Sequence, residues 1–109
     1  MNDLELMELV AKAAGYKIEW VRNSGCFYRC EEEIGREEWN PLDDDGDAFR
    51  LAIKLGICIQ LIPQCDTAQV YQERESTGEH FNIHVSALGD IELRRIITQA
   101  AAEIGKSMP

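Results

Sequence analysis

Residues 39–57 have the sequence WNPLDDDGDAFRLAIKLGI, and this stretch sets the organisation of the whole chain. Pro41 fixes its own φ angle and disfavours helical geometry at Asn40, so the chain turns here. The aspartates that follow are placed to cap the first N–H groups of a helix and to interact with the positive end of its dipole. The stretch therefore predicts a turn followed by a helix, with Trp39 packing near the helix entrance.

We expect this central helix to extend roughly from Asp44 to Leu55. Its apolar positions recur at helical spacing, with Phe49 and Ile53 widening the apolar stripe. Gly56 is suited to the left-handed geometry that ends many helices. One of Asp43, Asp44 and Asp45 is expected to be the capping residue.

The length and composition indicate one globular domain, residues 1–109. The chain is 45% hydrophobic, and no apolar run is long enough to span a bilayer. Its first five residues are acidic rather than basic, which argues against a secretory signal. We therefore expect a cytoplasmic protein that does not associate with membranes.

The negative charge is concentrated in one segment. Of the net charge of −9, residues 31–47 contribute −8, because they hold nine acids and one base, Arg36. Such a patch repels nucleic acid and attracts basic surfaces, although most charge runs are simply solvated. The acids are Glu31, Glu32, Glu33, Glu37, Glu38, Asp43, Asp44, Asp45 and Asp47.

Periodicity predicts two further helices, one at each end of the chain. Residues 3–14 have one apolar face and are followed by Gly15 as a helix stop. Near the other end, Asp90 is expected to cap a helix with a long apolar stripe, which ends at Gly105.

A hairpin is expected after the first helix, because residues 16–22 and 26–30 have strand character and flank an Asn-Ser-Gly turn signal. Residues 31–38 contain too few apolar side chains to pack and are expected to be a charged connection.

Three strands are expected between the last two helices. Residues 57–63 are apolar on both faces, which is typical of a central strand. Residues 69–75 are polar and are expected near an edge of the sheet. Residues 80–86 alternate, and we expect Phe81, Ile83 and Val85 to point inward.

The expected order of elements is therefore α-β-β-α-β-β-β-α. Short connections favour antiparallel pairing, and helices with one apolar side must cover one face of the sheet. The sequence predicts an α+β domain of two layers, with three helices and a mostly antiparallel sheet of about five strands.

The four cysteines suggest a metal site, but their spacing is unfavourable. Cys26 and Cys30 are separated by three residues, and Cys58 and Cys65 by six, whereas the usual zinc knuckle has two. Residues four apart on a strand lie about 13 Å apart, too far to share one ion. We interpret the cysteines as reduced thiols that act as small hydrophobic residues, and expect no cofactor.

The histidines and aspartates give no stronger metal signal. His80 and His84 are also four apart on an expected strand, so a site there would need a Cys or Glu of a neighbouring strand. Aligning Gly46 with the glycine of a calcium loop places Pro41 and Ala52 at the first and last ligand positions, which excludes an EF-hand.

The sequence contains no nucleophile elbow, phosphate-binding glycine loop or dinucleotide fingerprint. An enzyme is therefore unsupported by any motif. Arg94 and Arg95 are the only adjacent basic residues, so the chain also lacks the basic footprint of a nucleic-acid reader, and we do not expect direct nucleic-acid binding.

The segment from Trp39 to Leu55, with its W-N-P-L-x-D-D-G-D-A pattern, resembles a motif of small uncharacterised proteins of tailed phages and prophages. Residues 100–105, AAAEIG, are similar to the C-terminal helix of those proteins, and the order of elements is distantly similar to the NinX-like phage family. The resemblance covers about a quarter of the chain. It implies a phage accessory protein made inside a bacterial host cell, and it assigns no catalytic residue.

Three hypotheses follow. The first is a non-enzymatic module that binds an unidentified host or phage protein, with an acidic surface that imitates the charge of nucleic acid. The second is a metal-dependent or small-molecule-binding enzyme that uses Cys58, Cys65, His80 or His84. The third is a structural homo-oligomer formed through Trp39 and the helices. For the first, the expected contact residues are Glu37, Glu38, Trp39, Asp43, Asp44, Asp45 and Asp47.

Overall fold

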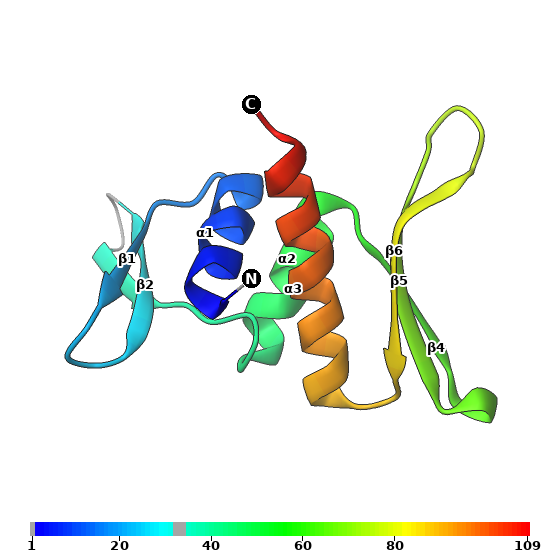
Figure 1. Cartoon of the computed structure of the whole chain (residues 1–109), viewed down its shortest axis with the longest axis horizontal. Coiled ribbons are helices and arrows are strands. Elements are labelled where there is room, and N and C mark those ends of the chain that lie inside the picture. Colours follow the sequence, from blue (N-terminus) through cyan, green and yellow to red (C-terminus); the bar gives the residue numbers. More distant parts are fainter. Residues whose placement is uncertain (1, 32–34) are drawn as a thin grey trace.

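A computed structural model of the chain describes residues 2–31 and 35–109. Three helices occupy the middle of the molecule, and a three-stranded antiparallel sheet lies on each side of them (Figure 1). The elements are α1 (Asp3–Ala14), β1 (Ile18–Val21), β2 (Cys26–Glu31), β3 (Gly35–Glu38), α2 (Asp45–Leu55), β4 (Cys58–Ile62), the 3-10 turn η1 (Pro63–Cys65), β5 (Thr67–Glu73), β6 (His80–Ala87) and α3 (Asp90–Ser107).

The α+β class and the three helices are confirmed, but the prediction of one sheet of about five strands is wrong. Gly35–Glu38, expected to be part of a charged connection, forms β3 and pairs with β2. All four of its residues are exposed, so the strand has no apolar periodicity that could have revealed it. Opposite charges stabilise the pairing instead, because Arg29 lies across from Glu37.

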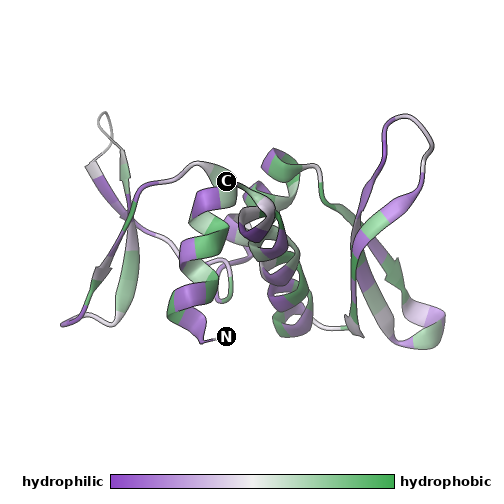
Figure 2. Ribbon diagram, turned by 45° about the horizontal axis from the view of Figure 1, so that its top comes forward, coloured by the Kyte–Doolittle hydropathy of each residue, from purple (hydrophilic) through white to green (hydrophobic). Residues whose placement is uncertain are grey.

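The sheets stay separate because the chain crosses the helical layer between them. After β3 it passes through the turn at Asn40 and Pro41 into α2, and only then reaches β4. Figure 2 shows hydrophobic residues on the helices and also on the C-terminal sheet, β4–β6. No helix within the described residues is both long and apolar enough to cross a membrane.

The helices form most of the core. α1 packs closely along α3, whose small residues Ala100, Ala101 and Ala102 are buried. Gly105, expected to end α3, instead lies inside it, and the helix continues to Ser107. A Cβ atom at Gly105 would lie 2.0 Å from the carbonyl oxygen of Leu9. The glycine is therefore needed because the backbones of α1 and α3 approach each other here.

In the C-terminal sheet, the expected positions of β4 and β5 are exchanged. β5 is the central strand, and β4, expected to be central because it is apolar on both faces, is an edge strand. Ala68 and Val70 of β5 are fully buried beneath α3, which compensates for the polar residues elsewhere in this strand. Leu61 of β4 is 52% exposed.

The orientation expected for β6 is correct for Phe81 and wrong for Ile83 and Val85. Phe81 lies beside Gln72 and Ile104, whereas Ile83 and Val85 are more than half exposed. The cause is a bulge, in which Asn82 adopts a φ of 51° and the register with β5 shifts. The face toward α3 is polar here, because Asn82 Nδ2 donates a hydrogen bond of 2.9 Å to the carbonyl oxygen of Ala100.

We predict that Gly105→Ala destabilises the protein by about 1–3 kcal/mol, because the added methyl group has no room beside the α1 backbone. The sign is informative, since glycine to alanine in an uncrowded helix interior is stabilising. Denaturant unfolding measures the change. Ser107→Ala, at an exposed position of the same helix, is the control and should change the stability by no more than about 0.5 kcal/mol. A Gly105→Ala variant as stable as the native protein would contradict the close approach.

Candidate functional site

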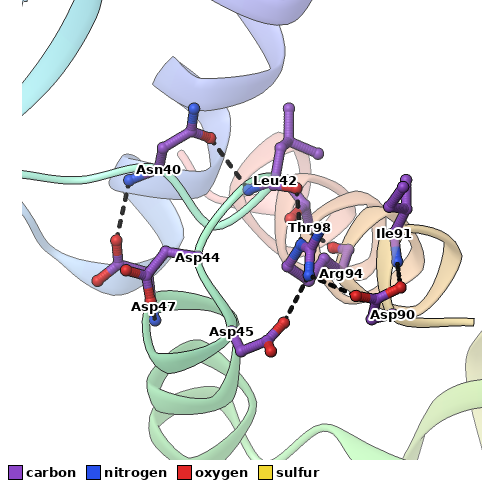
Figure 3. Close-up of polar contacts among 9 residues, drawn as sticks. All are labelled: Asn40, Leu42, Asp44, Asp45, Asp47, Asp90, Ile91, Arg94 and Thr98. Atoms are coloured by element: carbon purple, nitrogen blue, oxygen red, sulfur yellow. Dashed lines mark hydrogen bonds and ion pairs between the residues drawn. The ribbon is translucent and has the colours of Figure 1, made fainter.

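The acidic segment enters α2 through a rigid turn. Asn40 Oδ1 accepts a hydrogen bond of 3.0 Å from the N–H of Leu42, and the carbonyl oxygen of Asn40 accepts from the N–H groups of Asp43 and Asp44. The N–H of Asn40 donates to Asp47 Oδ2 at 3.0 Å (Figure 3). The first turn of α2 is therefore tied to the turn that precedes it.

Asp44 is the N-cap of α2, and it is one of the three aspartates that the sequence offered for this role. Its side chain accepts a hydrogen bond of 3.0 Å from the N–H of Asp47. This bond satisfies a backbone donor that has no partner within the helix. The carboxylate is therefore needed to begin the helix.

Asp45 forms an ion pair with Arg94, a residue of α3. The Nη1 atom of Arg94 lies 2.6 Å from Asp45 Oδ1, and its Nε atom donates a hydrogen bond of 2.9 Å to the carbonyl oxygen of Leu42 (Figure 3). The Arg94 side chain is only 13% exposed. The hydrogen bond to Asp45 raises the pKa of the Arg94 guanidinium above its ordinary value. Periodicity could not reveal this contact, because the residues are 49 positions apart.

Asp47 is also occupied by structural contacts. Its Oδ1 atom accepts a hydrogen bond of 2.8 Å from Arg50 Nη2, in addition to the bond from Asn40. The Arg50 side chain is exposed, and the hydrogen bond to Asp47 raises its pKa. Asp47 thus joins the turn, the first turn of α2 and the charged surface.

Trp39 does not belong to the surface. It is 2% exposed and packs edge-on against Tyr16, with ring centroids 5.8 Å apart. The backbone N–H of Trp39 donates a hydrogen bond to the carbonyl oxygen of Phe27 in β2. The expectation that Trp39 packs near the entrance of α2 agrees with this position, whereas a role in direct contact with a partner does not.

Glu37, Glu38 and Asp43 are exposed and make none of the bonds that tie α2 to the turn and to α3, whereas Asp44 and Asp45 are exposed but make such bonds. Within the described residues, Asp43 makes no side-chain hydrogen bond. A hollow of about 270 Å³ lies at this surface and is lined by Glu38, Asn40, Asp43, Asp44 and Asp47. A neighbouring hollow of about 220 Å³ is lined by Arg29, Glu37, Glu38, Trp39, Asp47 and Arg50. We call the surface formed by Glu37, Glu38 and Asp43 the acidic face.

The folded surface is less negative than the sequence suggests. Arg29, Arg50 and Arg94 come from β2, α2 and α3 and lie against acids of this segment. Of the acids counted in the sequence, Glu32 and Glu33 lie outside the described residues. The charge of −8 is therefore a property of the segment and not of the surface it forms.

The cysteines and histidines are dispersed. Within the described residues, no three His, Cys, Asp or Glu side chains gather in a way that could hold a metal ion. His80 stacks on Tyr71, and His84 Nε2 lies 2.9 Å from Asn82 Oδ1. Cys26 lies near Glu38, and its hydrogen bond to that carboxylate, with burial, raises the pKa of the thiol.

Comparison of the chain with protein-family models, with curated proteins and with solved structures gives no match. The resemblance to phage proteins, and the roles of the residues described above, therefore depend on the sequence and the geometry alone.

We predict that Asp44→Ala lowers the free energy of unfolding by about 1 kcal/mol, because the N–H of Asp47 loses its acceptor. Asp43→Ala is the matched control: it removes the same group one residue earlier, where the side chain makes no hydrogen bond, and should change the stability by less than about 0.5 kcal/mol. Urea unfolding of both variants makes the comparison. Equal losses would show that the cap contributes nothing specific.

We also predict that Cys26 reacts slowly with iodoacetamide at mildly alkaline pH, because its raised pKa leaves little thiolate. Glu38→Gln removes the negative charge and the charged acceptor, so it should lower the pKa of Cys26 and speed its alkylation. Mass spectrometry of peptides measures the rate. The exposed Cys65 is the internal control, and its rate should not change. An unchanged rate at Cys26 in the variant would contradict the influence of Glu38.

Proposed function

We propose that this protein is a non-enzymatic accessory protein of a tailed phage or prophage that binds a protein partner in the cytoplasm of the bacterial host. The contact surface is the acidic face, and the partner presents a lysine-rich or arginine-rich segment. The single observation that carries the proposal is the hollow in which Glu38, Asp43, Asp44 and Asp47 converge.

The chemistry of this hollow favours a cation. Four carboxylate side chains and the amide of Asn40 supply oxygen acceptors around a space of about 270 Å³. Carboxylates held close together repel one another. An ammonium or guanidinium group placed among them relieves that repulsion and donates charge-assisted hydrogen bonds to the carboxylates. The hollow is large enough for the end of one such side chain.

The hollow is also held in place before a partner binds. Asp44 and Asp47 are fixed by their bonds to the α2 backbone and to Asn40, and the carbonyl of Leu42 is fixed by Arg94. A surface that is already ordered loses little conformational entropy on binding. Glu37, Glu38 and Asp43 are therefore the residues to change, because their substitution leaves the bonds of Asp44, Asp45 and Asp47 intact. It removes the ion pair of the exposed Glu37 with Arg29, at 3.7 Å, and the charge of Glu38 beside Cys26.

We predict that the native protein captures a partner from a lysate of the bacterial host and that the variant Glu37→Gln/Glu38→Gln/Asp43→Asn does not. Loss of three negative charges removes the attraction for a basic segment, and the native interaction should weaken as salt is added. Quantitative mass spectrometry of the captured proteins gives the measurement, and circular dichroism verifies that the variant is folded.

The matched control is Glu73→Gln/Glu75→Gln/Glu79→Gln, which removes the same charge from exposed positions at the end of the C-terminal sheet. It should retain the partner. Loss of the partner in both variants would show that only the net charge matters, and retention in both would show that the acidic face is not the contact. Either result, or the absence of any captured protein, would overturn the proposal.

A further inference from the structure

The edge strands of the two sheets differ in how they are protected from pairing with another chain. Within the described residues the edges are β1, β3, β4 and β6. An open edge offers unpaired N–H and C=O groups, and proteins protect such edges with charges, short strands or bulges. β1 has four residues and carries Glu19, three of the four residues of β3 are charged, and β6 has the bulge at Asn82.

β4 has neither charge nor bulge, and at five residues it is longer than β1 and β3. Its sequence, Cys58-Ile59-Gln60-Leu61-Ile62, contains no charge and no proline, and its pairing with β5 is regular along the whole strand. Gln60 and Leu61 are exposed at its centre. A short, uncharged strand that is apolar on both faces and open along one side is the type of edge that another strand extends.

An uncovered apolar groove adjoins this edge. Ile59 and Leu61 share the face of Ala68 and Val70, but α3 covers β5 and β6 and leaves the inner side of β4 open. The groove measures about 300 Å³ and is lined by Asp45, Ala48, Phe49, Ile59, Asp90, Leu93, Arg94 and Ile97.

Phe49, which lines this groove, belongs to the apolar stripe that the sequence predicts for α2, as does Ile53. Phe49 is 59% exposed and Ile53 is 66% exposed. They are four positions apart, which is one helical turn, so they form a continuous exposed ridge on α2, and Phe49 lines the groove together with Ile59 of β4. The isolated chain leaves this part of the apolar stripe uncovered.

We propose that the β4 edge is the interface of a homodimer, in which β4 pairs antiparallel with β4 of a second copy about a twofold axis at Gln60. The argument for a second copy is that the strand is complementary to itself. In this register Ile59 lies opposite Leu61 of the second copy and Cys58 lies opposite Ile62. The two Gln60 side chains, whose Oε1 atoms accept hydrogen bonds from Gln69 of their own copies, meet at the axis. Aliphatic residues thus meet apolar residues on both faces, and no charge meets a like charge along the strand.

The same register brings the two grooves together. The two three-stranded sheets become one sheet of six strands, and Ile59 and Leu61 of both copies form a continuous apolar strip on its inner face. The ridges of Phe49 and Ile53 from both copies flank that strip, so exposed apolar groups gain cover without a change in the fold. This surface is separate from the acidic face, and the dimer does not depend on the proposed function.

The test is the mass of the native protein in reducing buffer over a wide concentration range, measured by sedimentation equilibrium. We expect a monomer–dimer equilibrium. Gln60→Lys places two ammonium groups together at the axis and should raise the dissociation constant by at least about tenfold. Because Gln60 is exposed, the variant should keep its fold, which circular dichroism verifies. Ile53→Lys, in the exposed ridge of α2, is a second variant that should also weaken the dimer.

Ser76→Lys is the matched control, because it adds the same charge at an exposed position in the turn between β5 and β6. It should leave the dissociation constant unchanged. A native protein that stays monomeric at every concentration would overturn the proposal. A dimer that persists unchanged in both Gln60→Lys and Ile53→Lys, or that Ser76→Lys weakens equally, would place the interface elsewhere and would overturn it too.

Discussion

The guanidinium group of Arg94 joins α3 to the entrance of α2. From α3 it contacts the carboxylate of Asp45 and the carbonyl oxygen of Leu42, residues 49 and 52 positions away in the chain. Both partners belong to the entrance of α2, so one side chain fixes the position of that helix against α3 (Figure 3). The planar guanidinium is suited to this role, because its several N–H donors have fixed directions and can reach two acceptors at once.

Around this contact, the acids that stabilise the fold differ from the acids that we propose bind a partner. Asp44, Asp45 and Asp47 cap the helix, pair with Arg94 and tie the turn, so their carboxylates have partners within the chain even though Asp44 and Asp45 are exposed. The two carboxylates of β3 and that of Asp43 are exposed and make none of these bonds. A segment with a high density of charge can therefore serve two purposes, and sequence composition alone does not distinguish them.

The division into two sheets gives the molecule surfaces of different character. One side of the α2 entrance carries the acidic face, while the other side of α2 carries the apolar ridge of Phe49 and Ile53 beside β4. Partner binding and dimer formation are therefore proposed for separate regions. A dimer would present two acidic faces, and a partner with two basic segments would gain from this arrangement through effective concentration.

Local sequence determined the three helices, the caps of α2 and the turn at Pro41, because these depend on residues within a few positions of one another. Asp44 as N-cap and Gly56 as a left-handed C-cap are examples. The ends of α3 were predicted wrongly, since Gly89 and not Asp90 is its N-cap and the helix continues past Gly105. Tertiary structure decided which faces were covered. β3 could not be expected from its sequence, because all of its residues are exposed. The apolar sequence of β4 predicts a buried strand whether or not a neighbouring strand covers it. The same holds for Gly105, Trp39 and Arg94, whose roles depend on Leu9, Tyr16 and Asp45, distant residues that only the folded chain brings near.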